Sequence, residues 1–299
     1  TRRDIVFSCH LDHPSPGTND ISSGCSGILE IARTLNRLIA DKKLPQPERS
    51  IRFIWPCEIE CTISLLAARR EVTDRALATI HLDMIGGNTE ITKGTLKVEG
   101  SPPSLPSFVS DVGFAIARWV DAQSLAYAND GQAAFPLLAE EGTKLPLRAQ
   151  IGGFSEGSDH QVWAEGSWKI PVIYLADWPD LYIHTQKDVP ANIDPTKLKR
   201  AMFIAAASAW ALANLAPGER AEQIADAVRA EMLERASAGM RKAAGLPPEE
   251  RVNLLRHAGA HEAAVNASTT RFGLALGLVS GMETTAAAPA RSRVYRRNA

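Results

Sequence analysis

Apolar residues in this chain gather in short runs that are separated by longer segments with helical spacing. The short runs predict buried strands at 4–9, 51–55, 76–84, 95–100 and 169–177. The longer segments, whose apolar residues recur every three or four positions, predict helices at 22–42, 62–72 and 195–215 and within 101–122. Because strands and helices alternate, we expect an α/β fold with a mixed, mostly parallel, doubly wound sheet sandwiched by helices.

The pattern changes after Pro217, where the chain becomes rich in alanine and charged residues. Residues 219–245 and the stretch after 250 predict amphipathic helices, packed on the main domain or on a partner. Residues 291–299 are basic and predict a loose tail. We therefore expect an α/β domain over 1–216 and a helical extension over 217–299. Because a strand begins almost at once after Thr1, we expect the α/β domain to be truncated at its amino end.

Composition narrows the classes of partner. Hydrophobic residues make up 45% of the chain, charged residues 22%, and the formal net charge is −1. Near-neutral charge gives no electrostatic reason to expect a nucleic acid or an anionic membrane as a partner. Apolar stretches fall short of the roughly 20 residues that span a bilayer. We expect a soluble protein and slightly favour the cytoplasm, while the compartment and the oligomeric state stay open.

The four cysteines are Cys9, Cys25, Cys57 and Cys61. The spacing of Cys57 and Cys61 matches neither a zinc ribbon nor a thioredoxin motif. A chain of this length and apolar content needs no disulfide framework, so we expect reduced, buried thiols.

Histidines and carboxylates follow the predicted strands where those strands end. In an open α/β sheet, functional side chains gather just beyond the carboxyl ends of the strands. Burying many carboxylates together is costly unless a positive charge neutralises them, and lysine and arginine are scarce near these positions. Mixed imidazole and carboxylate ligands suit zinc, and two zinc ions about 3.5–4 Å apart can share one carboxylate. The strand-end residues are His10, Asp12, Glu58, Glu60, Asp83, His184 and Asp188.

Six motifs stand in one order along the chain and together resemble a known family. They are "HLD" at 10–12, "PGTNDISSG" at 16–24, a strand ending in Glu at 58–60, "HLDMIGG" at 81–87, "GSDHQVW" at 157–163 and "IHTQKDVPANIDP" at 183–195. In this order they resemble the co-catalytic di-zinc aminopeptidases, family twenty-eight of the metallopeptidases, over roughly residues 4–215. The resemblance implies the zinc exopeptidase fold.

The resemblance also implies a role for individual residues. His10 and Asp83 would hold one zinc ion, His184 would help to hold the other, and Asp20 would bridge the two. Glu58 would be the general base that takes a proton from the metal-bound water. Residues expected just behind the ligands are Asp12, which would orient the His10 ring, and Asp159, His160 and Asp188.

One part of the motif departs from the family pattern. The family has two adjacent glutamates, base then ligand, followed by glycine, whereas this chain has "EIEC" at 58–61. Ile59 therefore stands where the second glutamate is expected. Glu60 or His13 would complete the second metal site, or that site would be weak; His13 is slightly favoured.

These observations favour a zinc-dependent aminopeptidase that removes amino-terminal residues from peptides by means of a metal-bound hydroxide and Glu58. Its partner would be a peptide with a free amino terminus, and its cofactor would be two zinc ions, with one ion as the alternative. A single-zinc enzyme resembling glutaminyl cyclases and a catalytically degenerate homologue that acts as a binding or scaffold module remain alternative hypotheses.

Overall fold

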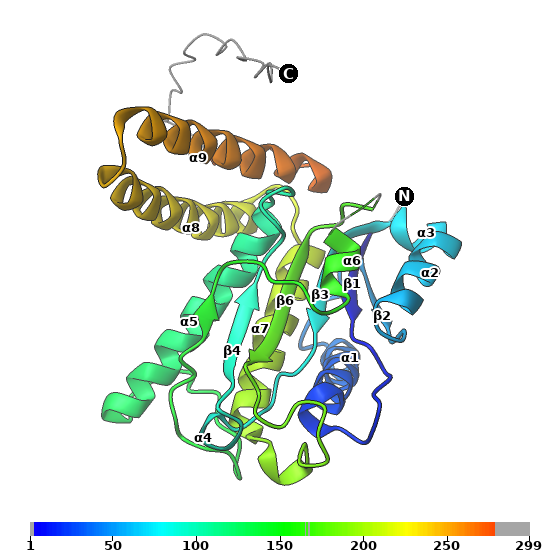
Figure 1. The fold of residues 1–299 in the computed structure, drawn as a ribbon. Coiled ribbons are helices and arrows are strands. Elements are labelled where there is room, and N and C mark those ends of the chain that lie inside the picture. Colours follow the sequence, from blue (N-terminus) through cyan, green and yellow to red (C-terminus); the bar gives the residue numbers. More distant parts are fainter. Residues whose placement is uncertain (1–2, 165, 167, 279–299) are drawn as a thin grey trace, which may run out of the picture.

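A six-stranded sheet forms the centre of the protein in the computed structural model, which describes residues 3–164, 166 and 168–278 (Figure 1). The strand order is β2-β1-β3-β6-β4-β5. The four adjacent strands β2, β1, β3 and β6 are parallel to one another. Strand β4 runs antiparallel to β6, and β5 runs parallel to β4. The predicted mixed, mostly parallel sheet is therefore confirmed. The strands are β1 (Asp4–Ser8), β2 (Ser50–Ile54), β3 (Ala76–Leu82), β4 (Thr95–Glu99), β5 (Gln150–Ile151) and β6 (Val172–Trp178).

Helices cover both faces of the sheet because its strands are apolar on both sides. In β1, Ile5 and Phe7 belong to the large core, whereas Val6 between them belongs to a smaller core on the other face. Helices α1 (Gly24–Ala40), α5 (Phe108–Asp130) and α7 (Pro195–Ala213) contribute to the large core. The smaller core surrounds the fully buried Trp163 and is covered by α2 (Glu60–Ala68), α3 (Arg70–Thr73) and α6 (His160–Ala164).

The ends of the long helices follow from local chemistry. Asp194 accepts a hydrogen bond from the Thr196 N–H and Pro195 occupies the first turn, so α7 begins at this point. Helix α5 ends at Gly131, whose φ of 73° suits glycine, and so extends past the predicted end at 122. The shorter elements are η1 (Thr18–Ser23), α4 (Thr89–Thr92), η2 (Pro190–Asn192) and η3 (Thr269–Phe272).

Two long helices, α8 (Glu219–Ala244) and α9 (Pro248–Ser268), form a hairpin at one end of the molecule (Figure 1). Arg235 of α8 joins this hairpin to α5, since it pairs with Asp111 of α5 and with Glu262 of α9. The predicted helical extension is therefore present. The predicted basic tail at 291–299 lies outside the described residues, and the division at 216/217 stays a prediction. None of the described helices combines the length and apolar character needed to cross a bilayer.

Candidate metal centre

The candidate ligands meet at one edge of the sheet. Strands β2, β1, β3 and β6 are adjacent and parallel, so their carboxyl ends lie together. Glu58, His10, Asp83 and His184 follow these four strands and line one cavity of about 360 Å³. Side chains that follow four separate strands are thus brought to a single site.

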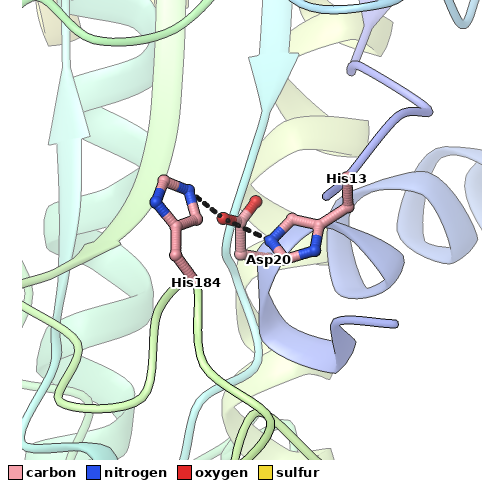
Figure 2. A group of neighbouring side chains, drawn as sticks. All are labelled: His13, Asp20 and His184. Carbon is pink, nitrogen blue, oxygen red and sulfur yellow. Dashed lines mark hydrogen bonds and ion pairs between the residues drawn. The ribbon is translucent and has the colours of Figure 1, made fainter. Parts of the chain in front are cut away.

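Asp20 is at the centre of the site, and its two carboxylate oxygens face different histidines. Oδ2 lies 3.2 Å from Nε2 of His13 and 3.0 Å from Nε2 of His184. Figure 2 shows the two imidazoles approaching this carboxylate from opposite sides, His13 from the loop after β1 and His184 from the loop after β6. Oδ1 lies 3.8 Å from Nε2 of His10. One carboxylate therefore stands between two groups of donors.

The second group consists of His10, Glu58 and Asp83. His10 Nε2 lies 3.7 Å from Oδ1 of Asp83 and 3.9 Å from Oε1 of Glu58. Within each group, potential ligand atoms lie within 4.8 Å of one another. Each group thus offers three nitrogen or oxygen donors at a separation compatible with one shared cation.

The donor chemistry fits a divalent cation. His10 donates its Nδ1–H to the Asp12 carbonyl over 3.0 Å, so Nε2 of the neutral ring carries a lone pair that faces carboxylate oxygens. Burial would lower the pKa of His10, but Asp83 and Glu58 outweigh burial and raise it to about 10. The carboxylates therefore favour a positive charge at this point, which a bound zinc ion would provide.

The buried acids of the site also repel one another. Burial, followed by the charge of Asp83, raises the pKa of Asp20. Burial likewise raises the pKa of Glu58 to about 7, and nearby carboxylates add to this effect while His10 opposes it. A cation between these groups would offset their repulsion.

Two further carboxylates hold the site in place through backbone hydrogen bonds. Asp188 accepts from the N–H groups of Asn19 and Asp20, over 2.8 and 2.9 Å. Asp12 accepts from the Glu58 N–H over 2.7 Å, and its Oδ1 lies 3.6 Å from Nδ1 of His10. Asp12 thus links His10 to the turn that carries Glu58.

Asp159 and His160 lie behind the centre. Asp159 accepts a hydrogen bond of 2.6 Å from the N–H of Ile59, a residue with a φ of 51°. His160 stacks on Tyr174 with ring centroids 3.6 Å apart, and Tyr174 Oη lies 3.5 Å from Oδ2 of Asp83. Tyr174 was not among the predicted site residues. The register of β6, which pairs Tyr174 with His81 two residues before Asp83, brings it to the site, and the sequence carries no signal for this register.

His13 and Glu60, the two candidates for the missing ligand of the second metal site, lie in different surroundings. His13 lies in the same group as Asp20 and His184, with 8% of its side chain exposed. Glu60 is exposed at the start of α2 and belongs to neither donor group among the described residues. Of the two residues, His13 is therefore the one that lies beside Asp20 and His184.

The expectation of reduced thiols is wrong for two of the cysteines. Cys57 and Cys61 form a disulfide, because the turn from β2 into α2 brings their Cα atoms to 5.0 Å. Cys9 and Cys25 are free. The disulfide closes a small loop that contains Glu58, Ile59 and Glu60.

A comparison of the sequence with known protein families shows the family of this chain. The sequence profile of Peptidase family M28 matches residues 1–209, and the chain belongs to this family. The predicted resemblance is thus confirmed. No curated protein sequence matches the chain.

Solved structures share the fold. An aminopeptidase from Aneurinibacillus sp. strain AM-1 superposes with a TM-score of 0.50 and 22% identity, covering 73% of this chain and 45% of that chain. A zinc aminopeptidase from Bacillus subtilis gives a TM-score of 0.50 and 20% identity, covering 73% of this chain and 48% of that chain. The chain spans about half the length of these two structures. At such identities the likeness shows a common fold.

Proposed function

We propose that this protein is a zinc-dependent aminopeptidase that binds two zinc ions. The observation that carries the proposal is Asp20, whose two oxygens face two separate groups of donors. Membership of Peptidase family M28 and the fold shared with two aminopeptidases support the same activity.

The side chains divide into two ligand sets. His10, Asp83 and one oxygen of Asp20 would hold one zinc ion. His13, His184 and the other oxygen of Asp20 would hold the second. Bound zinc would polarise the peptide carbonyl and lower the pKa of water.

Glu58 is suited to act as the general base. It lines the cavity beside His10, and its carboxylate is half-buried. A carboxylate in this position can accept a proton from water and pass it to the leaving amine. We propose that Glu58 moves these protons, and that Asp12 and Asp159 position it by holding the backbone of its turn. Asp188 would position the bridging carboxylate, and His160 would support Asp83 through Tyr174.

The single-zinc cyclase alternative predicts a different product from the same site. The protein, dialysed against zinc, should be incubated with leucyl-glycinamide and with a peptide that begins with glutamine. An aminopeptidase releases leucine from the first substrate, and removal of zinc by a chelator abolishes the release. Formation of pyroglutamate without leucine release would establish the cyclase instead. Zinc binding with neither product, and with no hydrolysis of leucyl-glycine or α-glutamyl p-nitroanilide, would indicate a non-catalytic homologue.

A further inference from the structure

The cavity beside the metal centre contains one cation that the proposed reaction does not use. Lys97 of β4 lines this cavity together with the candidate ligands, and 19% of its side chain is exposed. Among the described residues that line the cavity, Lys97 is the one lysine or arginine. A largely buried ammonium group needs an anion or hydrogen-bond acceptors to offset its loss of hydration.

Among the described residues, the carboxylate partner of Lys97 lies beyond hydrogen-bond distance. The nearest described carboxylate oxygen is Oε1 of Glu99, 3.8 Å from Lys97 Nζ, which is too long for a hydrogen bond. The other oxygen of Glu99 is engaged by Ser155, whose N–H and Oγ–H donate over 2.6 and 2.8 Å. Glu99 is thus held by Ser155 in a position where it does not close on Lys97.

Glu156 also lines the cavity, but it is exposed, and the carboxylate paired with Lys97 is that of Glu99. The remaining acids of the cavity have other partners or belong to the donor groups. Asp177 forms an ion pair of 2.6 Å with Lys197 and accepts from the Gly87 N–H. Asp20 and Asp83 belong to the donor groups, and Glu58 faces His10. The ammonium of Lys97 therefore has donor capacity left for an anion that enters the cavity.

We propose that Lys97 binds a carboxylate of the substrate, so that the enzyme prefers peptides carrying this group within reach of the cavity. This inference rests on the proposed aminopeptidase function. The carboxylate has two sources in a peptide: the side chain of an amino-terminal glutamate or aspartate, or the carboxyl terminus of a dipeptide. Lys97 would then determine specificity without taking part in proton transfer.

Matched substrate pairs separate the two sources. α-Glutamyl and glutaminyl p-nitroanilide differ only in the charge of the side chain. Leucyl-glycine and leucyl-glycinamide differ only in the terminal carboxylate. The kcat/KM of each substrate should be measured for the wild type, for Lys97→Met, and for Lys43→Met, an exposed lysine near the end of α1 that serves as the control.

We expect Lys97→Met to lower kcat/KM about tenfold to a hundredfold for one carboxylate substrate, the factor that a hydrogen bond to a charged group provides. Its neutral partner should change by less than about threefold, because removal of Lys97 leaves the metal ligands in place. Lys43→Met should leave all four values unchanged. Loss with the glutamyl substrate identifies a side-chain carboxylate, and loss with leucyl-glycine identifies the carboxyl terminus.

Two results would overturn the inference in different ways. If Lys97→Met lowers kcat/KM equally for charged and neutral partners, or for neither, Lys97 does not bind a substrate carboxylate, while the aminopeptidase function stands. If zinc-loaded wild type hydrolyses none of the four substrates, the proposed function fails and the inference fails with it. A preference of the wild type for both neutral partners would also reject the role of Lys97.

Discussion

Glu58 lies in a turn whose backbone is held from two directions. Its own N–H donates to Asp12, and the N–H of the following Ile59 donates to Asp159. These bonds direct the Glu58 side chain towards His10 and the cavity, whereas the Glu60 side chain is exposed. Proton transfer and metal binding can therefore be tested separately at this site.

Glu58→Gln removes the proposed base and keeps the size of the side chain. We expect kcat to fall about 10²–10⁴-fold, because an amide cannot accept the proton. Zinc content should stay at the wild-type level, since the proposed ligands are unchanged. Steady-state kinetics and elemental analysis on the same preparation test this. Activity close to that of the wild type would assign the base to another residue.

The ligand role of His13 is tested against Glu60. His13→Ala should lower zinc content and activity together, because Asp20 and His184 alone bind the second ion weakly. Glu60→Ala should leave both within about twofold of the wild type, since an exposed side chain outside the donor groups contributes little. The opposite order of the two variants would return the ligand role to Glu60.

How far the sequence predicts the site depends on the residue. His10, Asp83 and His184 follow apolar strands, so the topology of a parallel sheet brings them together. The choice between His13 and Glu60 depends on how the loop after β1 folds back onto Asp20, which strand patterns do not contain. Tyr174 and Lys97 lie within strands, where alternation marks the face of a side chain but not its role.

At the scale of elements, the sequence predicted the bounds of strands and helices well where the apolar pattern extends over many residues. Strands β1, β3 and β6 and helices α1 and α7 agree with their predicted ranges to within a few residues. Strand β5 and helix α6 were missed because they contain only two and five residues. The disulfide was missed because sequence spacing alone does not tell that the turn from β2 into α2 brings the two cysteines together.

The disulfide belongs to the element that carries Glu58. Replacing both Cys57 and Cys61 by serine should lower kcat several-fold, because the turn gains freedom and Glu58 spends less time in place. Zinc content should be retained, since neither cysteine belongs to the donor groups of the described residues. A reducing agent should have the same effect on the wild type and none on the double variant. An unchanged kcat would show that Asp12 and Asp159 suffice to hold the turn.

At the scale of the whole molecule, the α8–α9 hairpin is joined to the α/β part by a charged cluster. Arg235 is 30% exposed and pairs with two almost fully buried carboxylates, Asp111 at 2% and Glu262 at 8%. Burial raises the pKa of Asp111 to about 6 although Arg235 opposes it. Without the guanidinium of Arg235, the two carboxylates would be buried and would lose the cation that they share.

Arg235→Met should lower the free energy of unfolding by about 2–3 kcal/mol, below the usual cost of breaking a buried pair because Arg235 is partly exposed. Arg229→Met, on the same helix, is the matched control, since its partners Glu222 and Asp226 are 70% and 76% exposed. Denaturant titration measures both variants. Adding Asp111→Asn and Glu262→Gln to Arg235→Met should restore part of the loss. Equal stability of the two arginine variants would show that the cluster does not stabilise the hairpin.

The central claim is that Asp20 joins two zinc sites in one chain. The most direct test is the zinc content of purified protein after reconstitution with zinc and dialysis against metal-free buffer, measured by elemental analysis. We expect about two zinc ions per wild-type chain and a clear loss from both sites in Asp20→Asn, because the bridging oxygens serve each ion. Zinc at background level in the wild type, or the same content in Asp20→Asn, would contradict it.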